Sequence, residues 1–111
     1  MKKIIVSVVA LSALVLTGCA QEPKQNLDAF AKCLTEKGAM IYTSPTCSHC
    51  QNQKKLFGDS WQYINNVDCM ANPQVCSVAG IQSVPNWMIN GESLLGQQSL
   101  ETLAEKTGCE I

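Results

Sequence analysis

Positive charge is scarce in this chain, which contains no arginine. Its 111 residues include eight lysines, and from residue 19 onward six lysines stand against nine acidic residues, a net side-chain charge of about −3. The lysines form no basic patch, so nothing in the sequence predicts binding to nucleic acid. Internal repeats and low-complexity tracts are also absent. We therefore expect one small domain with a single core.

The sequence also lacks an apolar run long enough to cross a bilayer. The longest run, residues 4–16, is too short to span a membrane as a helix and follows Lys2 and Lys3, as in an export signal. Residues 16–19, Leu-Thr-Gly-Cys, resemble the bacterial lipobox, in which the chain is cut before the cysteine. The resemblance implies a lipoprotein signal peptide over residues 1–18 and a lipidated Cys19. Ordinary secretory cleavage, which would leave Cys19 free or in a disulfide, is the alternative.

A short polar segment joins this cysteine to the rest of the chain. Residues 19–26 contain Pro23 and no helical periodicity, so we interpret them as the lipidated cysteine and a tether to a domain at residues 27–111. Extended at about 3.3 to 3.6 Å per residue, the tether reaches only about 20 Å. Ala20 resembles the residue that sorts proteobacterial lipoproteins to the outer membrane. We expect an exported protein anchored on the periplasmic face of a bacterial membrane, the outer membrane if the source is Gram-negative.

Helical and strand-like patterns alternate along the domain. Asn26 and Ser99 are candidate helix caps, and Asn90-Gly91 suits a type I′ hairpin. Apolar spacing, proline and glycine predict the remaining boundaries. The predicted helices are residues 27–37, 50–57, 73–79 and 100–107, and the predicted strands are residues 39–43, 66–69, 86–89 and 93–95.

Two cysteines three positions apart stand at the start of the second predicted helix. Cys47 and Cys50 flank Ser48 and His49. The first cysteine would lie among unpaired backbone N–H groups at the positive end of the helix dipole, which favours its thiolate. Such a setting lowers a cysteine pKa from about 8.5 to roughly 3.5 to 7.5, and the thiolate is the species that attacks a disulfide. The pattern predicts Cys47 as the nucleophile and Cys50 as the resolving thiol.

His49 leaves two interpretations open. Beside the Cys47 thiolate it would stabilise the reduced form and make the disulfide a stronger oxidant, whereas a solvent-exposed histidine would not affect the thiol. The competing function class is metal binding, in which Cys47, His49 and Cys50 hold Zn²⁺ or Cu⁺ with a fourth ligand. Because no second ligand pair has the usual short spacing, we favour disulfide chemistry, with no metal and no organic cofactor.

At these residues the chain resembles the thioredoxin superfamily. It shares the C-x-x-C after a strand and Val84-Pro85 ahead of the hairpin. The resemblance implies an α/β thioredoxin-like fold, with a central mixed sheet of about four strands flanked by helices. It also implies that Pro85 is cis beside the redox pair and that backbone groups around Val84 pair with an extended substrate. Trp87, two positions further on, is expected to line the substrate groove.

A closer resemblance is to the thioredoxin-like domain found fused to, or beside, bacterial homologues of vitamin K epoxide reductase. It rests on residues 47–58, 69, 76, 80–87, 89–91 and 99–101. The resemblance implies disulfide exchange with exported proteins that carry thiols or disulfides. It also implies a quinone-coupled membrane partner, which here would be a separate polypeptide. Thr46 and Ser48 depart from the aromatic and proline residues frequent at these positions, which leaves the redox potential open.

Four further cysteines are expected to form structural disulfides. Cys69 and Cys76 lie at a strand end and in the following short helix, which favours a local bridge. Cys33 and Cys109 then remain as a pair by elimination, a staple for a small domain. The alternative for the first pair is a second redox couple. The sequence thus predicts a monomeric, membrane-anchored, extracytoplasmic protein thiol–disulfide oxidoreductase, an oxidant or isomerase rather than a reductase.

Overall fold

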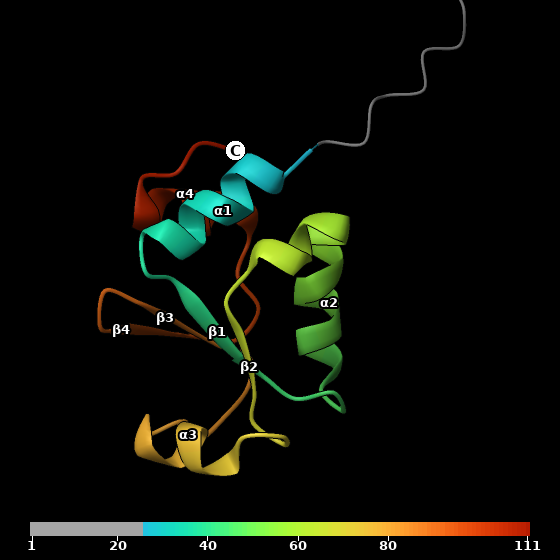
Figure 1. Cartoon of the computed structure of the whole chain (residues 1–111), viewed down its shortest axis with the longest axis vertical. Helices are drawn as coiled ribbons and strands as arrows, with labels where there is room; N and C mark the ends of the chain where they lie inside the picture. Colours follow the sequence, from blue (N-terminus) through green and yellow to red (C-terminus); the bar gives the residue numbers. More distant parts are fainter. Residues whose placement is uncertain (1–25) are drawn as a thin grey trace, which may run out of the picture.

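The computed structural model describes residues 26–111, in which helices and strands follow the predicted order (Figure 1). The helices are α1 (Asp28–Glu36), α2 (Ser48–Phe57), the 3-10 helix η1 (Gly58–Tyr63), α3 (Pro73–Val78) and α4 (Leu100–Thr107). The strands are β1 (Met40–Thr43), β2 (Asn66–Asp68), β3 (Asn86–Ile89) and β4 (Glu92–Leu95). None of these helices has the length and apolar character needed to cross a bilayer. The predicted signal peptide, Cys19 and residues 20–25 of the predicted tether lie outside the described residues.

The four strands form one mixed sheet in the order β2-β1-β3-β4. β1 runs parallel to β2 and antiparallel to β3, so that Ile41 lies between Asn66 on one side and Trp87 on the other. β3 and β4 are antiparallel and joined by Asn90 (φ 51°) and Gly91 (φ 79°), which have the positive φ values of the predicted type I′ turn. The predicted mixed sheet of about four strands flanked by helices is confirmed.

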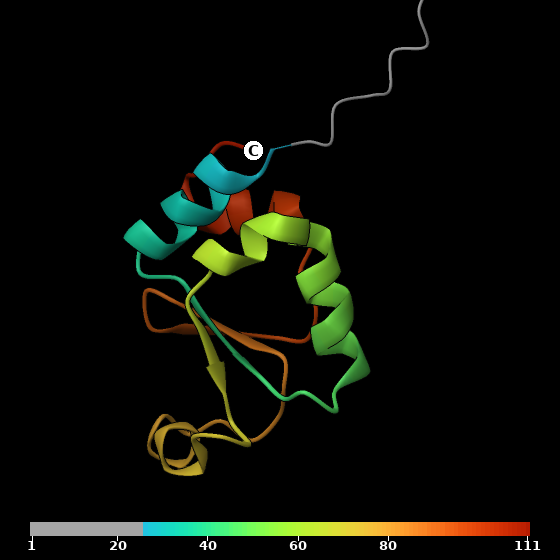
Figure 2. The same cartoon turned by 45° about the vertical axis from the view of Figure 1, so that its right-hand side comes forward.

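Helices lie at both ends of the molecule, and α2 runs between these ends. Figures 1 and 2 show α1 and α4 together at one end, where the described chain also begins and ends, and α3 at the opposite end. In both views the turn that leads into α2 lies at the α3 end. The end of the molecule that carries the cysteine pair is therefore remote from both ends of the described chain.

The core is one cluster with members from α1, β1, α2, β3 and α4. Phe57, the last residue of α2, packs its ring 6.1 Å from Phe30, 5.7 Å from Trp61 and 6.2 Å from Trp87, measured between centroids. Trp87 is completely buried. The prediction that Trp87 lines a substrate groove is therefore wrong, because the alternation of side chains along β3 turns its indole into the core.

The N-cap of α4 is the residue that the sequence predicts, whereas the N-cap of α1 lies one residue after the predicted one. Ser99 caps α4 as predicted, since its hydroxyl accepts a hydrogen bond from the backbone N–H of Thr102 at 3.1 Å. The N-cap of α1 is Leu27 rather than Asn26. The Asn26 side chain still accepts from the backbone N–H of Asp28 at 2.9 Å. The first turn is thus supported from the predicted position, which lies one residue before the observed N-cap.

Two disulfides hold peripheral segments to this core. Cys33 of α1 is bonded to Cys109 beyond α4, across 76 positions of sequence, with a Cα–Cα distance of 5.9 Å. Cys69, just after β2, is bonded to Cys76 of α3, with a Cα–Cα distance of 5.7 Å. These are the pairs that the sequence favours. The first ties the two terminal helices together, and the second ties α3 to the sheet.

Candidate functional site

Cys47 is the N-cap of α2. Its backbone is extended (φ −92°, ψ 117°), so its sulfur turns back over the first turn of the helix. The Cys47 Sγ accepts a hydrogen bond from the backbone N–H of Cys50, 3.2 Å away. This hydrogen bond holds the sulfur over the first turn of the helix. The side chain is partly exposed, so this sulfur can meet another protein.

Cys50 lies on the opposite side of the same turn, facing the interior. The buried residues of α2 are Cys50, Gln53 and Phe57, which share one face of the helix. The Cys50 side chain is only 3% exposed. This burial, reinforced by a hydrogen bond with the Cys47 side chain, raises the pKa of the Cys50 thiol from 9.0 to about 11. Cys50 is therefore a protonated thiol at neutral pH, held directly behind an accessible one.

Val84 and Pro85 lie beside this pair, although they are distant in sequence. The Val84–Pro85 peptide bond is cis. The Cys47 thiol donates to the carbonyl oxygen of Val84, with 3.7 Å between sulfur and oxygen. Pro85 itself is buried and leads directly into β3. The structure thus brings the predicted nucleophile together with two of the three predicted substrate-binding residues.

His49 does not join this group. Its side chain is exposed and makes no hydrogen bond within residues 26–111. Of the two interpretations that the sequence left open, the geometry fits the exposed histidine. No cluster of three His, Cys, Asp or Glu side chains able to hold a metal ion occurs in the described part of the chain. The alternative of a metal site at Cys47, His49 and Cys50 therefore gains no structural support.

A cavity of about 180 Å³ opens behind the buried thiol. Cys50 forms part of its wall, Thr43, Asn66 and Asp68 line its sheet side, and Lys54 lines its helix side. The Thr43 hydroxyl donates to Asn66 Oδ1 at 2.7 Å. At about 30 Å³ per water molecule, the cavity has room for several. The sequence analysis missed this polar lining because its members come from three elements that only the folded sheet brings together.

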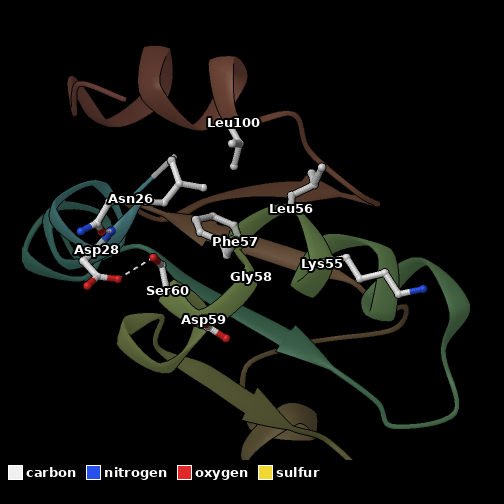
Figure 3. A pocket seen from close by; sticks show the side chains of 10 residues that line it. Asn26, Asp28, Lys55, Leu56, Phe57, Gly58, Asp59, Ser60 and Leu100 are labelled. Carbon is white, nitrogen blue, oxygen red and sulfur yellow. Dashed lines mark hydrogen bonds between the residues drawn. The ribbon is translucent and has the colours of Figure 1, made fainter. Parts of the chain in front are cut away.

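A larger cavity of about 510 Å³ lies away from the thiols (Figure 3). The start of α1, the end of α2, η1 and Leu100 of α4 form its wall. At its rim the Ser60 hydroxyl donates to the Asp28 carboxylate, and Phe57 and Leu100 face the open space (Figure 3). Its lining contains no thiol and no imidazole. The chemistry therefore belongs to the cysteine end rather than to this larger cavity.

Comparison with known proteins identifies relatives with the same kind of chemistry. No family model matches the chain. The chain is similar to the thiol-disulfide oxidoreductase LTO1 of Arabidopsis thaliana, with 37% identity over 92 residues that cover 75% of this chain and 24% of the plant protein. It is also similar to thioredoxin of Methanocaldococcus jannaschii, with 33% identity over 75 residues that cover 59% of this chain and 85% of the archaeal protein. The chain thus spans about a quarter of the plant relative and most of the archaeal one.

Proposed function

We propose that this chain, which belongs to the thioredoxin family, is a protein thiol–disulfide oxidoreductase that exchanges disulfides with exported proteins through Cys47 and Cys50. The observation that carries this proposal is the asymmetry of the pair. Cys47 is partly exposed and accepts a backbone hydrogen bond, whereas Cys50 is 3% exposed and lies one turn behind it. This is the arrangement that a nucleophile and a resolving thiol require.

The oxidising reaction begins from a Cys47–Cys50 disulfide. A substrate thiolate attacks the Cys47 sulfur, a substrate–Cys47 disulfide forms, and the Cys47–Cys50 bond breaks. Cys50 leaves with the electron pair and takes up a proton. A second substrate thiolate then attacks the substrate sulfur of the mixed disulfide and releases Cys47 as a thiolate. The substrate loses two electrons and the protein pair gains them.

The reductive direction depends on removing the Cys50 proton. After Cys47 has attacked a substrate disulfide, Cys50 must become a thiolate to displace the substrate. Its thiol is buried, but it lines the cavity that also reaches the Asp68 carboxylate and the Lys54 ammonium group. Water in that cavity would carry the proton from Cys50 to Asp68 or to solvent. Isomerisation of wrongly paired substrates uses the same two thiols in succession.

We place the protein outside the cytosol, anchored by a lipid on Cys19 to the periplasmic face of a bacterial membrane. The export-signal pattern and the lipobox-like residues 16–19 support this location. The two structural disulfides fit it as well, because disulfides form and persist in oxidising compartments. The same compartment favours an oxidant or isomerase over a reductase.

A separate quinone-coupled membrane protein is the proposed partner that reoxidises the pair. Thiol exchange needs no bound cofactor, so electrons taken from substrates must leave through a second protein. The resemblance to thioredoxin-like domains found beside homologues of vitamin K epoxide reductase supports this type of partner. Such a partner would meet the same exposed Cys47 sulfur as the substrates do.

Trapping experiments test the assignment of the two thiols. Cys50→Ala should accumulate mixed disulfides between Cys47 and substrate proteins, visible as thiol-sensitive bands on a non-reducing gel. Cys47→Ala should form none and should lose exchange activity on a dithiol peptide. His49→Ala is the matched control, because its exposed side chain makes no hydrogen bond to either sulfur, and it should behave as the wild type. Full activity of Cys47→Ala would refute the assignment.

The direction of electron flow is tested by equilibrating the Cys47–Cys50 pair with glutathione. Thioredoxin, a reductant, has a potential of about −270 mV, and the strong oxidant DsbA has one of about −120 mV. We expect a value on the oxidising side of this range. A potential near that of thioredoxin would leave the chemistry intact and contradict the oxidising role.

A further inference from the structure

We propose that the cavity of about 510 Å³ between α1, the end of α2 and α4 is a docking site for residues 22–24 of this chain, Glu-Pro-Lys. We call this cavity the tether site. The side chains that the docking uses are those of Asp28, Lys55, Leu56, Asp59 and Leu100. The segment itself lies outside the described residues. Docking is independent of the proposed thiol chemistry, and only its effect on the orientation of the domain rests on the proposed lipid anchor.

The first observation is where the described chain begins. Asn26 is the first described residue and forms part of the wall of the tether site. Residues 22–24 are joined to it through residue 25 alone. Three residues of extended chain reach about 10 Å, which is enough to cross a compact cavity of about 510 Å³. Because the segment is attached at the rim, its effective concentration in the cavity is high, and weak contacts suffice to hold it.

The second observation is the order of the side chains across the tether site, which Figure 3 shows. Asn26 and Asp28 lie at one side of the cavity, and Lys55 lies at the opposite side. Phe57 and Leu100 lie between them. Counted from the point where the described chain begins, the wall is therefore acidic first, apolar next and basic last.

Residues 22–24 carry the complementary groups in the same order. Lys24, the residue of the three that is nearest to the described chain, would lie against the acidic side. Pro23 would cover the apolar middle, where Leu56 is 39% exposed. Glu22 would then reach Lys55 at the far side. The proline also fixes one backbone angle in advance, which lowers the conformational entropy lost on docking.

The third observation is that the charges of the tether site have no ionic partner in the described part of the chain. The one ion pair within residues 26–111 joins Lys106 to Glu92, at 3.2 Å. Lys55 and Asp59 stand four positions apart, a spacing at which they could pair along a continuous helix. They do not pair, because α2 ends between them and Gly58 (φ 55°) turns the chain. An arriving segment therefore finds both charges available.

Docking would shorten the tether and orient the domain. Undocked, the tether reaches about 20 Å, whereas with residues 22–24 held only about 10 Å of chain separates the domain from Cys19. The tether site lies at the end of the molecule that carries α1 and α4, and the turn into α2, which holds Cys47, lies at the opposite end (Figures 1 and 2). The nucleophile is thereby directed away from the anchor and towards exported proteins. Release of the segment would restore the longer reach that an encounter with the proposed membrane partner needs.

Trypsin cleavage after Lys24 measures the docking. Trypsin cuts an accessible chain, so the rate of cleavage between residues 24 and 25 follows the fraction of molecules in which the segment is undocked. The full-length chain is purified in detergent with its thiols oxidised, and mass spectrometry follows the domain fragment that begins at Gln25. Lys55→Glu turns the attraction to Glu22 into repulsion and should raise this rate about fivefold.

Lys54→Glu is the matched control, because it makes the same change of charge and removes the same kind of cleavage site. Lys54 lines the smaller cavity behind Cys50, so cleavage after Lys24 should keep the wild-type rate. Adding Glu22→Lys to Lys55→Glu brings opposite charges together again and should restore the slow rate. The lysine introduced at position 22 precedes proline, where trypsin does not cut. Both lysines of α2 are exposed, so each variant should fold, and circular dichroism checks this.

Equal cleavage rates in the wild type and Lys55→Glu would overturn the docking. So would the same acceleration in Lys54→Glu, or a double variant that stays fast. Protection that grows with protein concentration would overturn it as well, because a second copy of the chain would then cover the segment. Protection that exists only in lipid vesicles would do the same, because the bilayer would be the cover. None of these outcomes concerns the exchange reaction, which the trapping variants test separately.

Discussion

Replacing the buried Gln53 by methionine should destabilise the fold more than any single surface change, because its amide ties the catalytic helix to two other elements. Gln53 has no exposed surface. Its Oε1 accepts from the indole N–H of Trp87 at 3.0 Å and from the backbone N–H of Gln98 at 2.7 Å. Its Nε2 donates to the Gln98 carbonyl oxygen at 3.0 Å. All of its hydrogen-bonding atoms are thus engaged inside the protein.

The expected cost follows from the groups left without partners. Methionine has a similar length and volume, so Gln53→Met removes hydrogen bonds without creating a cavity. The indole N–H of Trp87, in a completely buried residue, then loses its partner at a cost of about 1 to 3 kcal/mol. The two backbone groups of Gln98, a half-buried residue, cost about 0.5 to 1.5 kcal/mol each because water can reach them in part. The sum is about 2 to 6 kcal/mol, a large share of the roughly 5 to 15 kcal/mol that stabilises a domain.

Urea unfolding followed by tryptophan fluorescence measures this cost. Gln51→Met is the matched control on the same helix, because Gln51 is exposed and makes a single bond to the Pro45 carbonyl, and it should change stability by less than about 0.5 kcal/mol. In a Trp87→Phe background the cost of Gln53→Met should fall by about 1 to 3 kcal/mol, since the indole N–H is no longer present. A cost below about 1 kcal/mol in the wild-type background would refute the reasoning.

Three further predictions follow from the same geometry. Burial raises the pKa of Cys50, and only its thiolate displaces substrate, so the rate of substrate release should rise about tenfold per pH unit from pH 7. Stopped-flow release of a fluorescent peptide measures this rate, and a plateau below pH 9 would contradict the prediction. Replacing both Cys33 and Cys109 with alanine should lower the free energy of unfolding by about 4 kcal/mol, because their bond closes a loop of 76 positions. A urea midpoint that does not change when this bond is reduced would argue against the prediction. Ser99→Ala removes the hydrogen bond to the Thr102 N–H and should cost about 1 kcal/mol in thermal unfolding, whereas Ser99→Asp should retain most of the stability.

The parts of the fold that sequence analysis predicts well are those determined by neighbouring residues. The hairpin at Asn90-Gly91 needs positive φ at both positions, and asparagine and glycine adopt it most readily. Pro73 begins α3 because proline suits the first helical position, where no backbone N–H is needed. The cysteine pair is equally local, since the spacing of Cys47 and Cys50 is visible in the sequence before any fold is known.

The parts that sequence analysis misses are set by contacts between distant elements. Trp87 follows the cis proline so closely that a place in the substrate groove is a reasonable expectation. Its indole nevertheless points into the core, where its N–H finds the Gln53 amide 34 positions earlier in the chain. A glutamine in a predicted helix gives no sign of this partner. The polar cavity behind Cys50 is hidden for the same reason, because Thr43 and Asp68 meet there only once β1 and β2 pair.

The different environments of the two thiols follow from the register of α2. Cys47 is the N-cap, which lies outside the helix proper, and Cys50 is the third helical residue, on the face that also buries Gln53 and Phe57. A spacing of three residues therefore does two things at once: it brings the thiols close enough to bond, and it puts the second one inside. Because successive helical residues are turned by about 100°, inserting one residue between Ser48 and His49 would leave Cys50 in register with Gln53 and Phe57 and turn Cys47 away from it. The inserted variant should then keep the second thiol buried but lose the bond between the two sulfurs, and with it the exchange reaction.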